Sequence, residues 1–317
     1  MTSRIYIDGQ TGTTGLRIRE LLQHRDDLNV LVISEKHRKD AEARRDYMLN
    51  SDISIFCLPD DAAKEAAAWL EGSDTRIIDA STAHRVAPDW VFGLAELQAS
   101  QPNAIRNAKR VSNPGCYSSA FILLVRPLVE AGILAATSPL TIHALSGYSG
   151  GGKKMIARYD QPDSTLKQLP FENPYALARV HKHIPEMMRY TTLVTEPYFV
   201  PAVGAFRCGM RVQVPVPAQL LTVDDLEQVH ICLTEYYAKS LFVNVLPLAV
   251  SEEVDQSLYD PRSCNDTNRL DIRVMLHPSG HVLLMAILDN LGKGAGGMAV
   301  QNLNLMLGVD EVKGLIC

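Results

Sequence analysis

The chain has 317 residues, of which 46% are hydrophobic and 21% charged, and its formal net charge at pH 7 is −5. This composition is typical of a folded globular protein with one large or two smaller domains, and it excludes a disordered or fibrous chain. The slightly acidic balance argues against general nucleic-acid binding, and since the sequence has no run of about 18 apolar residues, we expect no transmembrane span.

Short apolar runs alternate with amphipathic stretches in the first third of the chain. The apolar runs predict strands at residues 4–7, 30–33, 53–58 and 76–80, and the amphipathic stretches predict helices at 14–23 and 61–70. Strands that alternate with helices of this length are typical of a parallel sheet built from βαβ units. We therefore predict an α/β fold that begins with a Rossmann-type domain.

The pattern changes after about residue 115. A helix at 118–131 is followed by segments that predict strands at 140–145, 192–199, 209–216, 241–250, 269–277 and 281–288, with helices at 223–237 and 295–307. Such a run of strands is typical of an α+β domain with a mostly antiparallel sheet. The stretch 149–174 is first rich in glycine and then polar, and it predicts a long functional loop.

A glycine-rich turn lies between the first predicted strand and the first predicted helix. Its glycine spacing is a variant of the dinucleotide-binding fingerprint, in which glycines permit a tight turn and let backbone N–H groups reach a pyrophosphate. The strand–turn–helix context favours a dinucleotide site over an ordinary turn. The candidate cofactor-binding residues of this turn are Gly9, Thr11, Gly12, Thr13, Thr14 and Gly15.

The end of the second predicted strand bears on the choice between NAD and NADP. Glu35 lies about 20 residues beyond the fingerprint, where an acidic residue favours NAD. Ser34 followed by Lys36 and Arg38 instead suits the 2′-phosphate of NADP, although two cations are also typical of a solvated loop. We predict NADP(H).

Cys116 is the candidate catalytic nucleophile. It follows the turn-forming residues Asn113, Pro114 and Gly115 and precedes an apolar helical run, which puts it at the start of a helix. The N–H groups and positive end of a helix stabilise a thiolate, although many free cysteines are simply buried apolar residues. The six cysteines are scattered and form no CxxC pair, so we expect no disulfide framework, no cysteine metal site and a reducing, cytoplasmic compartment.

Two histidines, His181 and His183, precede Pro185. Proline disfavours helical geometry in the residue before it and can open a helix, so we predict two extended histidines on one face, with Glu186 in the first helical turn. A histidine oriented by a carboxylate is suited to acid–base catalysis. A metal half-site and a pair of surface histidines are the alternatives. Because no further ligand cluster stands out, we expect no metal.

Six segments together resemble the short type of N-acetyl-gamma-glutamyl-phosphate reductase, within the group that contains aspartate-semialdehyde and glyceraldehyde-3-phosphate dehydrogenases. The segments are residues 9–15, 79–85, 113–117, 145–153, 181–186 and 289–297, and the resemblance covers essentially the whole chain. It implies a dinucleotide-binding domain at 1–115, completed by the terminal helix 290–317, and a catalytic and oligomerisation domain at 116–289. It also implies a homo-oligomer, usually a homotetramer.

The resemblance implies further site residues. Those for the cofactor are Ser81, Gly292 and Asn290, of which Asn290 would hold the nicotinamide amide. Those for the substrate are Arg85, Asn113, Ser146, Gly147, Lys153 and Arg207. The family leads us to expect an arginine nearer the glycine before Ala205. Arg207 is the candidate substitute, so the residue that binds the substrate carboxylate stays open.

The implied reaction is the NADPH-dependent reduction of N-acetyl-gamma-glutamyl phosphate to the semialdehyde, with phosphate release, in arginine biosynthesis. An acyl phosphate is already activated, so the Cys116 thiolate can displace phosphate and form a thioester. Hydride transfer then yields the aldehyde. Either histidine would move the proton, and we prefer His183 because it lies closer to Glu186. The alternatives are an aspartate-semialdehyde dehydrogenase and, from another class, a non-catalytic NADP-binding regulator.

Overall fold

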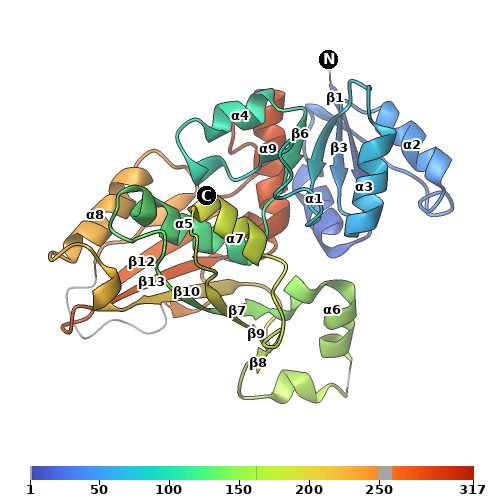
Figure 1. Ribbon diagram of the computed structural model, residues 1–317. Helices are drawn as coiled ribbons and strands as arrows, with labels where there is room; N and C mark the ends of the chain where they lie inside the picture. The colour runs from blue at the N-terminus through green and yellow to red at the C-terminus, as the bar shows by residue number, and fades with distance from the viewer. Residues whose placement is uncertain (1, 162, 249–258) are drawn as a thin grey trace. The chain divides into compact units, whose positions relative to one another are not determined.

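The computed structural model describes residues 2–161, 163–248 and 259–317 (Figure 1). The chain forms two compact units, the first comprising Met1–Gly115 and Ala295–Leu315 and the second Cys116–Gly294 and Ile316–Cys317. The chain thus rejoins the first unit at Ala295, whereas the family resemblance implies a return at residue 290. No helix among the described residues is both long enough and apolar enough to cross a membrane.

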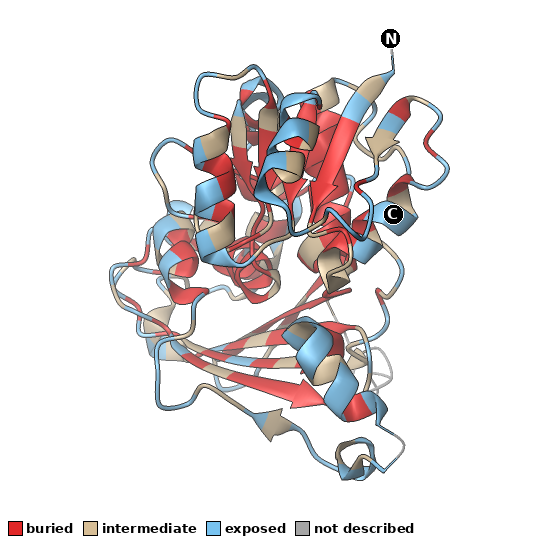
Figure 2. Ribbon diagram, turned by 90° about the vertical axis from the view of Figure 1, so that its right-hand side faces the viewer, coloured by how far each residue is buried: buried red, intermediate tan, exposed pale blue. Residues whose placement is uncertain are grey.

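A six-stranded sheet forms the centre of the first unit, in the order β2-β1-β3-β4-β6-β5. Its strands are β1 (Ser3–Asp8), β2 (Leu28–Leu31), β3 (Ile53–Phe56), β4 (Arg76–Asp79), β5 (Val91–Phe92) and β6 (Arg110–Ser112). Every neighbouring pair is parallel. Figure 2 shows the central strands as buried, as expected for a parallel sheet that helices cover on both faces.

Two hydrophobic cores lie on opposite faces of this sheet. In β1, Ile5 and Ile7 belong to one core and Tyr6 to the other, because side chains alternate along a strand. The first core is shared with α1 (Thr13–Leu22), α4 (Gln101–Asn107) and α9 (Gly297–Leu307), and the second with α2 (Ala41–Leu49) and α3 (Asp60–Trp69). The C-terminal helix α9 is therefore part of the core that supports β1.

The second unit contains a seven-stranded sheet in the order β11-β12-β13-β10-β7-β9-β8. Its strands are β7 (Thr141–Gly147), β8 (Asn173–Pro174), β9 (Tyr198–Gly204), β10 (Met210–Val216), β11 (Val243–Val245), β12 (Leu270–Leu276) and β13 (Val282–Leu288). The pairs β11–β12 and β7–β9 are parallel, and the other neighbours are antiparallel. The predicted combination of a Rossmann-type α/β domain and a mostly antiparallel α+β domain is confirmed.

Helices cover one face of the second sheet (Figure 1). The long apolar helix α5 (Cys116–Glu130) packs on β10 and β13 and contacts both α7 (Ile184–Thr191) and α8 (Glu227–Tyr236). The side chains of β10 alternate between buried and more exposed positions, so Gln213 and Pro215 point to the opposite face. That opposite face has a hollow of about 550 Å³, lined by residues such as His143, Gln213 and Leu283.

Several predicted elements are wrong in their bounds. The strand predicted at 192–199 begins only at Tyr198, because Thr192 has a φ of 61° that ends α7. The predicted loop 149–174 contains α6 (Gly152–Asp160), whose apolar side chains pack with Tyr148 and Val203. The strand predicted at 241–250 is limited to β11 among the described residues, and its last two residues lie outside them. The sequence pattern also does not predict α2, α4, β5 or β6.

Candidate active site

The glycine-rich turn connects β1 to α1 in a conformation that only glycine permits. Gly9 has a φ of +82°, and a Cβ at this position would lie 2.2 Å from the carbonyl oxygen of Cys57. A Cβ on Gly15 would lie 2.5 Å from the carbonyl oxygen of Gly9. Since both neighbours are backbone atoms that cannot move aside cheaply, these two glycines let the turn pack directly on β3 and α1.

The same turn has the features of a phosphate-binding site. Gly12 donates its N–H to the carbonyl of Gly9 at 2.8 Å, and α1 begins at the next residue. The first N–H groups of a helix have no partners within it, and its dipole favours an anion. Among the described residues, the Thr13 hydroxyl is buried and has no hydrogen-bond partner. The glycine cradle and this hydroxyl fit a dinucleotide pyrophosphate, with Thr11 and Thr14 half-buried in the same turn.

The loop after β2 presents the residues predicted to choose between NAD and NADP. Ser34 and Lys36 are exposed. Arg38 forms an ion pair with Glu35 in which Nε and Oε1 are 2.5 Å apart. The Glu35 carboxylate is therefore engaged by a cation, while Lys36 and Ser34 face solvent.

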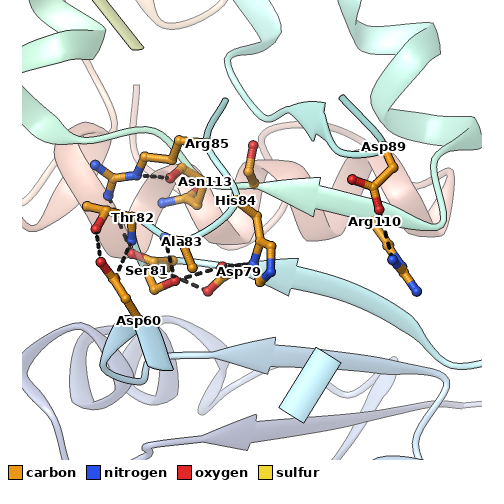
Figure 3. Close-up of polar contacts among 12 residues, drawn as sticks. Asp60, Asp79, Ser81, Thr82, Ala83, His84, Arg85, Asp89, Arg110 and Asn113 are labelled. Carbon is orange, nitrogen blue, oxygen red and sulfur yellow. Dashed lines mark hydrogen bonds and ion pairs between the residues drawn. The ribbon is translucent and has the colours of Figure 1, made fainter. Parts of the chain in front are cut away.

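The turn after β4 is held by a buried carboxylate (Figure 3). Asp79 accepts hydrogen bonds from the backbone N–H of Ser81 at 2.9 Å, the Ser81 hydroxyl at 2.7 Å and the Nδ1 of His84 at 2.6 Å. The His84 ring also stacks on Trp90. Asp60, at the start of α3, accepts from the backbone N–H and the hydroxyl of Thr82. Ser81, a predicted cofactor residue, therefore lies in a rigid turn at the carboxyl edge of the sheet.

Arg85 and Asn113 hold the peptide that leads into Cys116. Arg85 donates from Nε to the Asn113 carbonyl at 3.0 Å (Figure 3). The Asn113 side chain donates to the carbonyl of Ala295 at 3.1 Å and accepts from Asn302 at 3.0 Å. Both residues are buried, so these contacts favour a positioning role for them over the predicted contact with substrate.

Cys116 is the first residue of α5, as the sequence predicts, and it is half-buried. The first turn of α5 has no acidic residue that would oppose a thiolate. On its other side Cys116 meets a π-helical turn, Gly292–Gly296. A Cβ on Gly294 would lie 2.8 Å from the Cys116 Cβ, so this position requires glycine. A Cβ on Gly292 would likewise lie 2.2 Å from the carbonyl oxygen of Thr267. Close packing is therefore sufficient reason for glycine at this predicted cofactor-binding position.

Aromatic side chains and His181 gather around Tyr117, the residue that follows Cys116. The Tyr175 hydroxyl donates to that of Tyr117 at 3.3 Å and lies 3.5 Å from the Nε2 of His181. The ring of Phe199 packs edge-on against both Tyr117 and His181. The backbone N–H of His183 donates to the Nδ1 of His181 at 3.2 Å, so a neutral His181 carries its proton on Nε2, toward Tyr175.

Burial, with a smaller effect of the nearby Cys116, keeps these hydroxyls protonated. Burial, and to a smaller extent the nearby Cys116, raises the pKa of Tyr175 to about 12. Burial is also the main reason that the pKa of Tyr117 lies well above its usual value, and Tyr175 and Cys116 add to the shift. Both phenols therefore remain hydrogen-bond donors at neutral pH, close to the thiol.

The prediction that both histidines are extended is wrong. His183 has helical angles, φ −86° and ψ −13°, and the Ile184 N–H closes a turn on the His181 carbonyl at 2.9 Å. The two rings lie edge to face with centroids 4.7 Å apart. α7 begins at Ile184, and Glu186 is buried in its first turn, as predicted. Burial raises the pKa of Tyr190 to about 12, while the charge of Arg189 lowers it and the charge of Glu186 raises it.

Residues of the glycine-rich segment after β7 are fixed by the backbone around them. Ser146 is buried and donates its hydroxyl to the Gly147 carbonyl at 3.1 Å. A Cβ on Gly147 would lie 2.4 Å from the Arg207 carbonyl oxygen. Asn290 is buried, accepts from the Gly209 N–H at 2.8 Å and donates to the Ser149 hydroxyl at 2.9 Å. These contacts favour a structural use of the Asn290 amide over the predicted contact with nicotinamide.

Two predicted substrate-binding cations are accessible. Lys153 is exposed on α6. Arg207 has a side chain that is 59% exposed and pairs with Asp160 at 3.3 Å. Asp160 also accepts from Tyr148 at 3.1 Å and pairs with Lys167 at 3.0 Å. Arg207 is thus oriented by α6, at the margin of the glycine-rich segment.

Comparisons with known proteins agree with this geometry. The family described as semialdehyde dehydrogenase, NAD binding domain, matches residues 4–108, and the semialdehyde dehydrogenase dimerisation domain matches residues 116–290. An N-acetyl-gamma-glutamyl-phosphate reductase of Burkholderia orbicola is 45% identical over 96% of this chain and 97% of its own length. The Brucella ovis protein of the same name is 47% identical over 97% of this chain and all of its own length.

The chain belongs to the N-acetyl-gamma-glutamyl-phosphate reductases of the semialdehyde dehydrogenase family. The second reductase of Pseudomonas putida is similar too, at 44% identity over 99% of both chains. Solved structures confirm the fold. An aspartate-semialdehyde dehydrogenase II of Vibrio cholerae, complexed with ASA, has a TM-score of 0.72 at 16% identity and covers 97% of this chain and 99% of its own. The predicted family is confirmed.

Reasoning from the sequence missed two parts of this reductase site. Tyr175 carries no motif of its own, and its approach to Tyr117 and His181 depends on β8 pairing with β9. The sequence also gives no signal for the Asp79–His84 hydrogen bond, although both residues lie in the segment 79–85 that carries the family resemblance. Among the described residues, no three His, Cys, Asp or Glu side chains are placed to hold a metal ion.

Replacement of Gly9 by Ala tests the glycine turn. We expect Gly9→Ala to lose dinucleotide binding and to destabilise the protein by more than Gly72→Ala. Gly72 is a matched control, since it has a similar φ of +77° but nothing within 4 Å of its would-be Cβ. Strain at Gly72 should lower the free energy of unfolding by only about 1–2 kcal/mol. Chemical denaturation and NADPH fluorescence titration measure both effects, and equal behaviour of the two variants would refute the packing argument.

Proposed function

We propose that this chain reduces N-acetyl-gamma-glutamyl phosphate to N-acetylglutamate semialdehyde and phosphate with NADPH, as a step of arginine biosynthesis. The observation that carries the proposal is Cys116 at the start of α5, followed by Tyr117, whose hydroxyl meets that of Tyr175 and whose ring packs against His181. The family relatives carry this activity in their names. We also propose a cytoplasmic compartment, because the Cys116 chemistry requires a reduced thiol.

The first step is the attack of the Cys116 thiolate on the acyl carbon, which forms a thioester and breaks the bond to phosphate. The start of α5 stabilises the thiolate, and the absence of an acidic residue in its first turn avoids repulsion. Exposed Lys153 and Arg207 would attract the anionic groups of the substrate. Backbone N–H groups near Cys116 and in the segment after Gly147 would stabilise the oxyanion.

In the second step the thioester carbonyl is reduced, the C–S bond to Cys116 breaks, and the aldehyde leaves as the thiolate is restored. When bound, the nicotinamide cofactor supplies the hydride that reduces the thioester carbonyl. His181 would give and take the accompanying proton, since its Nε2 lies next to Tyr175 and the ring is half-buried rather than sealed. His183 is only 5% exposed and holds the Nδ1 of His181 through its backbone, which favours a positioning role. These contacts thus favour His181 as the acid–base residue, whereas the sequence favoured His183. Glu186 would stabilise the start of α7.

We propose NADP(H) as the cofactor and a homo-oligomer as the working form. Lys36 and Ser34 are available to the 2′-phosphate, and Arg38 occupies the carboxylate of Glu35 that would otherwise bind the ribose hydroxyls of NAD. The match to a dimerisation domain supports self-association. A second copy would cover the free face of the second sheet, where the apolar hollow lies, and a homotetramer would contain two such pairs.

The two alternative functions, an aspartate-semialdehyde dehydrogenase and a non-catalytic regulator, have less support. The likeness to aspartate-semialdehyde dehydrogenases is confined to the fold, at 16% sequence identity. A non-catalytic NADP-binding regulator has no use for a cysteine at the start of a helix, bordered by a histidine and two tyrosines.

A phosphate-dependent assay of cofactor reduction tests the proposed function. We expect N-acetylglutamate semialdehyde to be oxidised efficiently and aspartate semialdehyde poorly, and kcat/KM for NADP to exceed that for NAD. Comparable turnover of both aldehydes would contradict the substrate assignment. A preference for NAD would show that Glu35 binds the ribose.

Replacement of Cys116 by Ser should abolish turnover and leave NADPH binding nearly intact, because it removes the thiolate but not the glycine turn. Steady-state rates and NADPH titration separate the two effects. Cys232→Ser is the matched control, since Cys232 is also half-buried in the second unit and donates to the Pro127 carbonyl. Near-normal activity of Cys116→Ser would rule out the thioester mechanism.

The two histidines should separate kinetically. We expect His181→Asn to lower kcat by about 10²–10⁴-fold, the usual effect of one acid–base group, with KM little changed. His183→Asn should lower kcat much less, because the backbone N–H that holds Nδ1 of His181 remains and only the ring packed edge to face against His181 is lost. The opposite pattern would return the proton-transfer role to His183. If neither variant loses turnover, the pair is structural.

A further inference from the structure

A buried ion pair ends the first strand of the sheet. Arg44, in α2, donates from Nε at 3.1 Å and from Nη2 at 2.8 Å to Oδ2 of Asp8, the last residue of β1. The two side chains are only 12% and 4% exposed. The guanidinium also lies over the ring of Trp69, 5.0 Å from its centroid. The pair is therefore fixed on both sides and largely removed from solvent.

The other ionisable groups around Asp8 do not offset its charge. Burial and then the charge of Asp8 raise the pKa of Tyr6, whose hydroxyl lies 3.4 Å from Oδ1. Burial, with Asp79 and Asp8, likewise raises the pKa of the Cys57 thiol. Both groups are uncharged at neutral pH. Burial alone would lower the pKa of Arg44, but hydrogen bonds and the charge of Asp8 raise it, with a smaller contribution from Glu65. Arg44 is therefore the cation that balances Asp8.

Asp8 adjoins the turn that suits a phosphate. Gly9 follows it directly, and the N–H of Cys57, the residue after the neighbouring strand β3, donates to the Asp8 carbonyl at 2.8 Å. An unbalanced carboxylate here would repel a pyrophosphate at the start of α1, and charges interact strongly where water is scarce. The helix dipole is equivalent to only about half a charge and would not overcome a full negative charge beside it.

We propose that Arg44 is a positioning residue that neutralises Asp8 and so lets the turn at Gly9 accept the anionic phosphates of a dinucleotide. This proposal rests on the proposed NADPH-dependent function. Because both donors of Arg44 that contact Asp8 point into the protein, its part is to set the charge and shape of the turn rather than to bind the cofactor.

The test compares four variants by NADPH titration, without turnover. We expect Arg44→Met to raise the Kd for NADPH about tenfold or more, equivalent to about 1.4 kcal/mol, and Asp8→Asn combined with Arg44→Met to return it close to the wild-type value. Asp8→Asn alone should bind as tightly as wild type or more tightly. Arg4→Met is the matched control, because Arg4 pairs with Asp52 at the opposite end of β1, where both side chains are about half exposed.

Steady-state kinetics and chemical denaturation of the same variants give two further readouts. Arg44→Met should raise KM for NADPH with kcat at saturation little changed, and it should be less stable than the double variant, because it leaves a buried carboxylate without its cation. If Arg44→Met does not fold, the double variant decides, since the proposal requires it to bind like wild type.

Two results would overturn the proposal. If the double variant binds NADPH as weakly as Arg44→Met, Arg44 touches the cofactor directly. The same conclusion follows if Arg44→Met does not fold and the double variant binds more weakly than wild type. If Arg44→Met folds and binds like wild type, the charge balance has no effect on the turn. A wild-type protein that fails to bind NADPH would instead refute the proposed function and leave the ion pair as a purely structural feature.

Discussion

Asn113 is fixed at all four of its polar atoms, three residues before the Cys116 thiol. Its N–H donates to Asp79 of β4, its carbonyl accepts from Arg85, and its side chain joins Ala295 and Asn302. A buried amide with every partner satisfied cannot shift without losing several hydrogen bonds, each costly to leave unmade. The segment of the first unit that precedes α5 is therefore held in place within that unit, and the proposed chemistry of Cys116 relies on it.

Rigidity continues on the other side of the thiol. Gly294 lies against the Cys116 Cβ so closely that no side chain fits there, and Tyr117 is locked by Phe199 and Tyr175. The tyrosines are hydrophobic on their faces and donate hydrogen bonds at their tips, so they limit access of water and still present protons near the Cys116 sulfur. A reductase that passes through a thioester needs both properties, because water would hydrolyse the intermediate.

The sequence predicts those parts of the site that depend on neighbouring residues along the chain. Gly9 to Gly15 and Asn113 to Cys116 are of this kind, since glycine and proline act locally through backbone geometry. The extended conformation predicted for His183 is wrong, because a turn closed by the Ile184 N–H outweighs the preference for extended backbone before Pro185. Helix α6 and the approach of Tyr175 to His181 depend on packing between distant segments. The Asp8–Arg44 pair, 36 residues apart, has no local signal at all.

Two buried carboxylates lie in one row at the carboxyl edge of the parallel sheet, because Asp8 and Asp79 both pair in register with Phe56 of β3. Each must be compensated, since an isolated charge in the interior is unstable. Asp8 has a permanent cation, Arg44, whereas Asp79 has a serine hydroxyl, a backbone N–H and His84. Arg44 is a permanent cation, whereas a hydroxyl and a backbone N–H solvate a carboxylate without adding charge. The carboxylate at the β1 end, where the glycine turn lies, is therefore paired with a guanidinium that α2 supplies. This pairing is the reason for proposing that the turn at β1 accepts a phosphate.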